Sequence, residues 1–200
     1  MNLYFFEIIN GLAYKSVLMD KVMIVISNYL PYVFMATLVC MYLYGFHKES
    51  KALRRTAIDI VTMTVIDMLL SFVIGYLYPE ARPFVGHNVN QLIQHAPNSS
   101  FPSNHALGTM AIALGLIAPY RTCGIVFVCL AMLVGISRVY VGVHYPIDIL
   151  GGFALALLIN ACYRNLWQHK VREAYFQLEE GVLSVIAPCK ACRRYSKGNL

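Results

Sequence analysis

Long apolar runs separated by short polar segments dominate this chain of 200 residues. A helix that crosses a membrane needs about 20 mostly apolar residues. Runs close to that length cover residues 23–44, 57–78, 102–120, 122–140 and 146–163. The third run is the weakest, because its strongly apolar part is limited to residues 106–118. The pattern predicts an all-α fold, a polytopic membrane helix bundle with about five transmembrane helices.

The stretch before the first run is also rich in apolar residues. Its segment LYFFEIINGLAY (3–14) has neither a basic leader nor a small-residue cleavage site, so it is not typical of a cleaved signal peptide. A short interfacial helix fits the segment better. We therefore expect a single domain over residues 1–200, made of an N-terminal interfacial segment (1–21), a catalytic helix bundle (22–163) and a basic cytoplasmic tail (164–200).

Composition and charge agree with a membrane protein and indicate its orientation. Charged residues make up 13% of the chain, whereas soluble domains carry roughly 25%. Lysine and arginine gather in residues 47–55, at Arg121 and after residue 163, and short cytoplasmic loops retain such residues. This pattern predicts a cytoplasmic C-terminus, with segments 79–101 and 140–145 outside. The net charge of +6 is therefore a topology signal and not a sign of nucleic-acid binding.

Three segments carry the unusual polar residues, and all three fall on the predicted outer face. They are PEARPF (79–84), FPSNHALG (101–108) and SRVYVGVHYPID (137–148). An arginine close to hydrocarbon is unfavourable unless it is paired or hydrated. A guanidinium group binds phosphate oxygens through two parallel hydrogen bonds. Arg82 and Arg138 therefore indicate a phosphate ligand.

The second and third segments add groups that can carry out chemistry. Proline favours the first position of a helix and serine its cap, so a helix is expected to begin near 102–103 with free N–H groups that bind anions. His105, just inside that helix, can hold a proton for a leaving group. Pro146 suits another helix start, and Asp148 follows His144 by four residues and can orient its ring. An imidazole oriented in this way is a nucleophile or a base.

The three segments resemble the signature of the type 2 phosphatidic acid phosphatase superfamily, which reads K-x6-R-P, P-S-G-H and S-R-x5-H-x3-D. The third part is matched fully, by Ser137, Arg138, His144 and Asp148. The second part is matched with Asn104 in place of the glycine, by Pro102, Ser103 and His105. The first part is matched only by Arg82 and Pro83, because Gly75 stands where the family has lysine. Glu80 and the five-span layout resemble, within the superfamily, the bacitracin-resistance type of undecaprenyl-diphosphate phosphatase.

The resemblance implies a role for each matched residue. His144 is the implied nucleophile that forms a phosphohistidine, Asp148 holds its tautomer, and His105 protonates the leaving lipid monophosphate. The implied phosphate-binding residues are Arg82, Ser103 and Arg138, and the candidate substrate contacts are Glu80 and Asn104. Neither a metal nor a cofactor is expected, because two arginines and a helix end supply the positive charge.

The implied activity is hydrolysis of undecaprenyl diphosphate to undecaprenyl phosphate and inorganic phosphate on the outer face of a bacterial plasma membrane. Such a reaction recycles the carrier lipid for cell-wall synthesis and confers bacitracin resistance. The alternatives are a phosphatase of phosphatidylglycerol phosphate, phosphatidate or a lipid A phosphate, and a non-catalytic lipid-phosphate carrier. The carrier is less favoured, because the chain shows no internal repeat. The expected partners are a polyprenyl diphosphate and membrane lipids, without nucleic acid, and the oligomeric state stays open.

Other polar residues have ordinary interpretations. Asp67, midway along the second run, favours an interhelical hydrogen bond over a proton path. His87 and His95 in the outer loop can touch a diphosphate, although loop histidines are mostly solvated. The isolated pair CKAC (189–192) has the spacing of a zinc or redox site but no second pair of ligands.

Overall fold

The computed structural model describes residues 1–186, which are helical over most of their length and contain no strand. The Cys189 and Cys192 pair lies outside the described residues. The helices that follow one another in this range are α1 (Asn2–Asn10), α2 (Val17–His47), α3 (Lys51–Leu77), α4 (Pro83–Gly86), α5 (Asn104–Ile117), α6 (Arg121–Tyr140), α7 (Pro146–Leu166) and α8 (Gln168–Ile186). The chain forms two compact units, Met1–Ala161 and the part from Cys162 onward, which contains α8.

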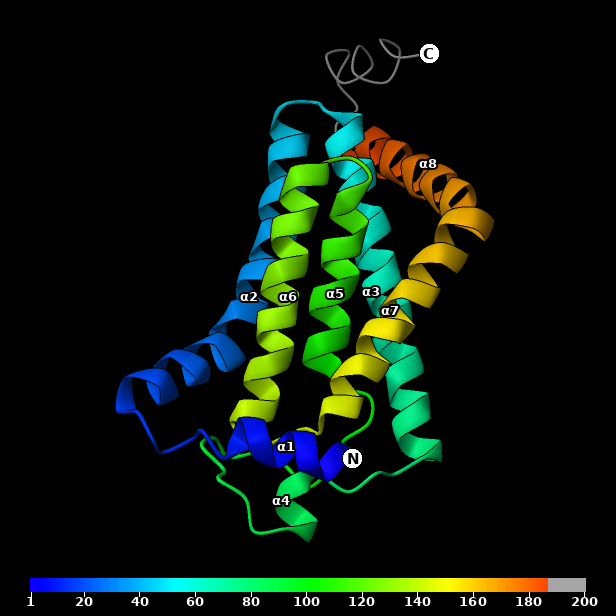
Figure 1. Ribbon diagram of the computed structural model, residues 1–200. Coiled ribbons are helices and arrows are strands. Elements are labelled where there is room, and N and C mark those ends of the chain that lie inside the picture. The colour runs from blue at the N-terminus through cyan, green and yellow to red at the C-terminus, as the bar shows by residue number, and fades with distance from the viewer. Residues whose placement is uncertain (187–200) are drawn as a thin grey trace. The chain divides into compact units, whose positions relative to one another are not determined.

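Helix α5 lies at the centre of the first unit. It packs against α6 and α3, and α2 in turn packs against α3 and α6 (Figure 1). The inner position explains why α5 is lined with small and medium apolar residues that are fully buried, among them Ala106, Leu107 and Ala113. The first turns of α7 also pack closely on α5. A Cβ at Gly152 would stand only 3.1 Å from the backbone oxygen of Ser103, so the two helices approach closely at this point.

The predicted all-α membrane fold is confirmed, and the run expected to be the weakest is the shortest of the five apolar helices in the bundle. Within the described residues, four helices are long and apolar enough to cross a membrane, namely α2, α3, α6 and α7. The fifth expected span is the shorter apolar helix α5, which has 14 residues. Its partners in the bundle cover it, so it does not need the length that a lipid-exposed helix requires.

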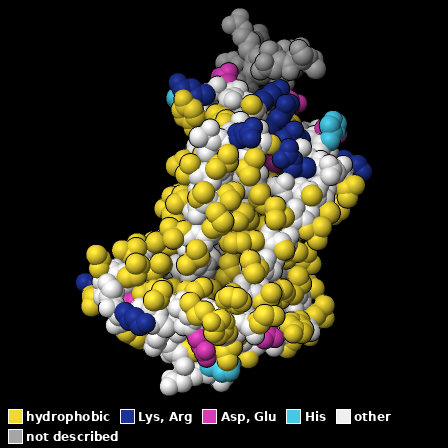
Figure 2. Space-filling view, viewed as in Figure 1, with side chains coloured by type: hydrophobic (Ala, Val, Ile, Leu, Met, Phe, Trp, Pro, Cys, Tyr) yellow, Lys and Arg dark blue, Asp and Glu magenta, His cyan; other side chains and the backbone are white. Residues whose placement is uncertain are grey.

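The surface of the bundle matches a lipid environment. Hydrophobic side chains cover the middle of the face seen in Figure 2. Large apolar side chains on α3 are strongly exposed, with Phe72 at 76% and Tyr76 at 79% of their free accessibility. Exposed apolar residues in such number are unfavourable in water but not in hydrocarbon. The chain is therefore a multi-pass membrane protein.

The segment between α2 and α3 is shorter than the sequence predicted. The expected basic loop 47–55 is reduced to residues 48–50, because Ser50 caps α3 by accepting a hydrogen bond from the Leu53 amide at 3.4 Å. Arg54, expected in the loop, is instead buried in α3 and donates a hydrogen bond to the carbonyl oxygen of Gly45 at 3.3 Å. The helix signals at Ser103 and Pro146 are confirmed, since Ser103 is the N-cap of α5 and Pro146 begins α7.

The helix connectivity brings the three polar segments to one end of the bundle. The end of α3, the start of α5, the end of α6 and the start of α7 all meet there, close to α1 and α4 (Figure 1). Helix α1 is bound to this end of the bundle through Asn10, whose side-chain amide donates to the carbonyl oxygens of Asn90 at 2.8 Å and Tyr140 at 2.9 Å. The long segment between α4 and α5 is thereby tied to the turn between α6 and α7.

Candidate active site

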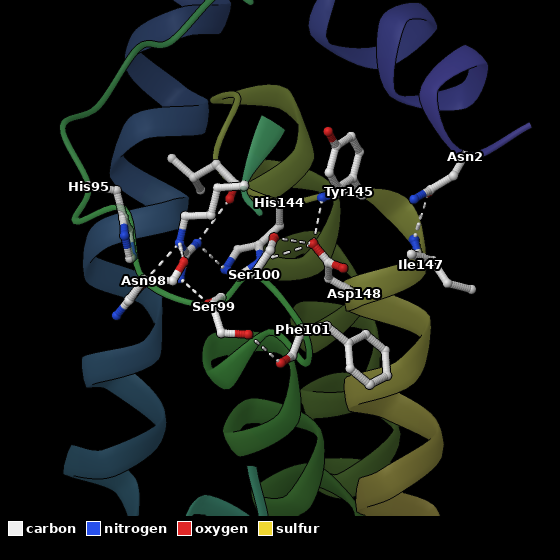
Figure 3. A network of polar contacts seen from close by, with 12 residues as sticks. Asn2, His95, Asn98, Ser99, Ser100, Phe101, His144, Tyr145, Ile147 and Asp148 are labelled. Carbon is white, nitrogen blue, oxygen red and sulfur yellow. Dashed lines mark hydrogen bonds and ion pairs between the residues drawn. The ribbon is translucent and has the colours of Figure 1, made fainter. Parts of the chain in front are cut away.

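The turn between α6 and α7 presents His144 beside Asp148. Nδ1 of His144 lies 3.4 Å from Oδ2 of Asp148, and both side chains are buried. The same carboxylate oxygen accepts hydrogen bonds from the hydroxyl of Ser100 at 2.5 Å and from the Tyr145 amide at 2.8 Å. Ser100 Oγ also lies 3.4 Å from Nδ1 of His144 (Figure 3). The predicted pairing of histidine and aspartate is therefore present, supported by a serine that the motifs do not contain.

The backbone of this turn needs a glycine. Gly142 has a φ of +86°, a region that residues with side chains rarely adopt. A side chain there would also stand 2.7 Å from the carbonyl oxygen of Asn90. The close approach allows the segment between α4 and α5 to run directly beside the turn that carries His144.

Arg82 lies on the other side of the His144 ring. Its Nη1 is 3.1 Å from Nε2 of His144 and donates to the carbonyl oxygen of Val143 at 2.9 Å. Its Nε donates to the backbone and side-chain oxygens of Asn98, and its Nη2 donates to the carbonyl oxygen of Ser99 at 3.1 Å. All three guanidinium nitrogens therefore have protein partners. Arg82 holds the segment before α5 against the turn that carries His144.

These contacts fix the tautomer of His144. A guanidinium group can only donate, so Nε2 of His144 must accept and carries the lone pair, while Nδ1 carries the proton toward Asp148. Burial is the main cause that lowers the pKa of His144 well below its ordinary value, and the positive charges of Arg82 and Arg138 lower it further. His144 is consequently a neutral imidazole at neutral pH, the form required of a nucleophile.

Burial also lowers the pKa of Arg82, to about 10, against an opposing contribution from Asp148. The guanidinium group keeps its positive charge at neutral pH.

Arg138 and Ser103 have polar atoms without protein partners. Nη1 of Arg138 donates to the hydroxyl of Ser27 on α2 at 2.9 Å, but its Nε and Nη2 are buried and have no hydrogen-bond partner in the described part of the chain. The hydroxyl of Ser103 is also buried without a partner and does not cap its own helix. Unpaired donors of this kind are unfavourable by about 1–3 kcal/mol each, more for charged groups. They are suited to an anion that brings oxygen acceptors.

A cavity of about 340 Å³ reaches this site. Its lining comes from α2, the segment before α5, α5 and α6, and consists of Asn28, Tyr29, Tyr32, Ile93, Gln94, His95, His105 and Arg138. The predicted acid, His105, thus shares one cavity with Arg138. Tyr29 and Tyr32 are 62% and 65% exposed, so the cavity joins the buried arginine to the outer surface of the bundle.

The remaining sequence candidates lie in different surroundings. The side chain of Asn104 accepts a hydrogen bond from Ser71 on α3 and does not line the cavity. Glu80 contributes its backbone oxygen, which accepts from the Ser100 amide at 2.8 Å. Asp67 is buried with both carboxylate oxygens unpartnered, so the interhelical hydrogen bond expected for it is absent from the described contacts. His87 is exposed, whereas His95 lines the cavity.

Sequence reasoning missed Ser100 and Ser27. Ser100 stands in a run of serines just before the second motif, and that proximity was the available signal. Ser27 is a buried serine inside an apolar helix, a position that suggests a polar partner across the bundle. Within residues 1–186, no three His, Cys, Asp or Glu side chains come together as the ligands of a metal ion would.

The arrangement joins an oriented neutral imidazole, a second histidine and unpartnered donors for an anion, at one end of a membrane bundle. Comparison with known proteins places it in a family. The PAP2 superfamily model matches residues 56–172. The chain therefore belongs to the PAP2 superfamily, as the motifs predicted, and is a membrane lipid phosphatase of that superfamily.

Individual relatives agree with this assignment. The undecaprenyl-diphosphatase BcrC of Bacillus subtilis (strain 168) is 35% identical over 160 residues, which cover 80% of this chain and 81% of the relative. Among solved structures, Aquifex aeolicus LpxE shares the fold with a TM-score of 0.69 at 24% identity, covering 82% of this chain and 94% of that one. A transmembrane PAP2-type phosphatidylglycerolphosphate phosphatase from Bacillus subtilis has a TM-score of 0.64 at 26% identity, covering 82% of this chain and 84% of its own.

Proposed function

We propose that this protein hydrolyses undecaprenyl diphosphate to undecaprenyl phosphate and inorganic phosphate, with His144 as the nucleophile. The observation that carries the proposal is the lone pair of His144 Nε2, fixed by Arg82 and Asp148, close to a cavity that Arg138 and His105 share. The relative BcrC is named an undecaprenyl-diphosphatase, and its match to this chain covers about four-fifths of both sequences. This similarity supports the choice of substrate.

In the first step, the lone pair of His144 Nε2 attacks the terminal phosphorus. The bond between that phosphorus and the bridging oxygen breaks, and its electron pair leaves with undecaprenyl phosphate. His105 gives a proton to the departing oxygen, as a general acid. The proton on Nδ1 stays directed at Asp148, so the carboxylate stabilises the positive charge that develops on the ring.

In the second step, water attacks the phosphohistidine. His105, now neutral, takes a proton from the water, the bond between nitrogen and phosphorus breaks, and inorganic phosphate leaves. Its electron pair returns to Nε2 of His144. The enzyme is thereby restored with both histidines in their starting protonation states.

The charge on the transferring phosphoryl group is balanced by groups already in place. Nε and Nη2 of Arg138 and the hydroxyl of Ser103 take the phosphoryl oxygens as their missing acceptors. The first amides of α5 add a positive helix end. Arg82 transfers its Nη1 hydrogen bond from Nε2 of His144 to a phosphoryl oxygen, which frees the lone pair for attack.

The test is phosphate release from undecaprenyl diphosphate in detergent with excess chelator. Wild-type protein is expected to release phosphate, and His144→Ala is expected to lose this activity entirely. His169→Ala is the matched control, because His169 is an exposed histidine on α8 and its activity should equal that of wild type. Label from a terminally radiolabelled substrate should appear on the quenched wild-type protein as an acid-labile, alkali-stable adduct, and release by His144→Ala would overturn the proposal.

The substrate is tested separately from the chemistry. We expect a higher kcat/KM for undecaprenyl diphosphate than for phosphatidate, phosphatidylglycerol phosphate or a lipid A phosphate. A preference for any of these monophosphates would overturn the substrate and leave the role of His144 intact. Expression in a sensitive bacterium should raise the inhibitory concentration of bacitracin, and expression of His144→Ala should not.

The proposed orientation puts this site outside the cytoplasm and the C-terminus inside. Basic residues at the opposite helix ends support it, since Lys48, Lys51 and Arg121 lie where α2 ends and where α3 and α6 begin. A fluorescent protein fused to the C-terminus should fluoresce, whereas alkaline phosphatase fused there should stay inactive. The reverse result would place the site in the cytoplasm.

A further inference from the structure

His95 lies at the catalytic end of the bundle although no sequence motif contains it. It belongs to the segment between α4 and α5, whose residues Leu92 and Ile93 pack against the buried turn after α6. Its ring is 6.3 Å from the ring of His144, centroid to centroid, at an interplanar angle of 72° (Figure 3). It also lines the cavity that contains Arg138 and His105.

The hydrogen bond of His95 determines which ring atom a ligand can reach. Nδ1 lies 3.0 Å from the carbonyl oxygen of Ala96. A carbonyl oxygen only accepts, so Nδ1 carries the proton and Nε2 is the other functional atom. Nε2 has no hydrogen-bond partner among the described residues. It can accept from a ligand when the ring is neutral, and it can donate when the ring is protonated.

The surroundings of His95 are deficient in negative charge. The titratable and charged groups of the neighbouring elements are Tyr29 and Tyr32 of α2, Arg82 before α4, His105 of α5, Arg138 of α6 and His144 of the turn after α6. None of the described residues that line the cavity carries a carboxylate. Burial, the main cause, lowers the pKa of His95, the Ala96 hydrogen bond raises it, and the charges of Arg82 and Arg138 lower it. A bound polyanion reverses the effect of these charges and favours a proton on Nε2.

The cavity is larger than one phosphoryl group requires. Its 340 Å³ corresponds to roughly ten water molecules. Arg138 offers donors at the buried end, and the exposed Tyr29 and Tyr32 mark the outer end. Because the ring of His95 lies 6.3 Å from that of His144, a diphosphate whose terminal phosphorus contacts His144 can place its second phosphate against His95.

We propose that His95 binds the second phosphate of a diphosphate headgroup through Nε2, and thereby selects diphosphate lipids over monophosphate lipids. This inference rests on the proposed function, because it names a contact within the same site. The phosphate concerned is the one that stays on the lipid after the terminal phosphate is transferred. His95 thus stabilises the bound diphosphate and the leaving monophosphate, and contributes nothing to a substrate with one phosphate.

The test compares kcat and KM for a prenyl diphosphate with those for phosphatidate, a lipid that carries one phosphate. In His95→Asn the shorter side chain keeps a donor for the Ala96 carbonyl but removes the atom at the position of Nε2. We expect its KM for the diphosphate to rise about 10- to 100-fold, because one charge-assisted hydrogen bond is lost. Its KM for the monophosphate lipid should equal that of wild type. His95→Gln, which restores an amide near the Nε2 position, should recover part of the preference. His87→Asn, at an exposed histidine of the same segment, should match wild type.

A pH series gives a readout that a purely structural role would not change. Protonated His95 donates to the second phosphate, so the wild-type KM for the diphosphate should rise with pH as that proton is lost, and KM for His95→Asn should lack this rise. Equal losses on both substrates, or no loss on either, would overturn the role of His95. The proposed function is decided separately by the wild type, which must hydrolyse the diphosphate.

Discussion

The two arginines at the site differ in what the protein already provides for them. Arg82 is held by carbonyl oxygens of Asn98, Ser99 and Val143 and by Nε2 of His144. Arg138 is equally buried, yet among residues 1–186 it has one hydrogen-bond partner, Ser27, and two of its nitrogens have none. A buried arginine whose nitrogens all have protein hydrogen-bond partners stabilises the fold, whereas one with unpartnered nitrogens is stabilised only when a ligand binds. We infer that Arg82 chiefly builds the site and Arg138 chiefly binds the phosphate.

Arg138→Met gives the largest expected effect among the variants of this comparison. It removes two donors and a positive charge from the transferring phosphoryl group, and one such donor is worth about 10²–10³ in kcat. We expect kcat/KM to fall by about 10³ or more. The melting temperature in detergent should stay the same or rise, because a buried charge with few partners is removed. Activity within tenfold of wild type would show that phosphate is bound elsewhere.

Arg82→Met should combine a loss of activity with a loss of stability. The substitution leaves the carbonyl oxygens of Ser99 and Val143 without their donor, at about 1–3 kcal/mol for each buried group. We expect the melting temperature to fall by about 5–10 °C and kcat/KM to fall by about 10². Thermal unfolding and kinetics on the same preparations test this. A stability equal to that of Arg138→Met would remove the distinction between the two arginines.

The pH dependence of kcat/KM also distinguishes Arg82 from Arg138. Burial and then Arg82 are the largest causes that lower the pKa of His144, followed by Arg138. Protonation of Nε2 removes the lone pair, so activity is lost as pH falls through that pKa. Removing the charge of Arg82 raises the pKa of His144, and the acid limb of the profile should move to higher pH. The shift should be smaller in Arg138→Met. Ionisation of the substrate is common to all variants and cancels between them.

Local signals in the sequence were enough to predict the helix starts and the central pair. Helix α5 begins directly after Ser103 and α7 begins at Pro146 as expected, and the spacing of four residues between His144 and Asp148 brings their side chains together. These features depend on neighbours along the chain. The length of α5 was overestimated, because the requirement for a full span applies to a helix in lipid and α5 is enclosed by other helices.

The partners of Arg82 could not be predicted, for a different reason. They are mostly backbone carbonyl oxygens, which every residue has, so their identity depends only on the path of the segment before α5. Ser100 and Ser27 carry common side chains in segments that belong to no motif. Ser27 lies 111 residues from Arg138 in the chain, and their contact depends on how α2 is rotated against α6.

Ser27→Ala removes the one hydrogen bond that the described residues form with the Arg138 guanidinium group, and it has the smallest expected effect. The substitution removes the 2.9 Å hydrogen bond that orients Arg138 but leaves the charge and the two donors for phosphate. We expect kcat/KM to fall about fivefold to tenfold, for roughly 1 kcal/mol of lost orientation. Thr37→Ala is the matched control, because Thr37 is a half-buried residue of the same helix whose hydroxyl donates to the Val33 carbonyl oxygen of its own helix. A loss as large as that of Arg138→Met would mean that the protein, and not the phosphate, holds this arginine in place.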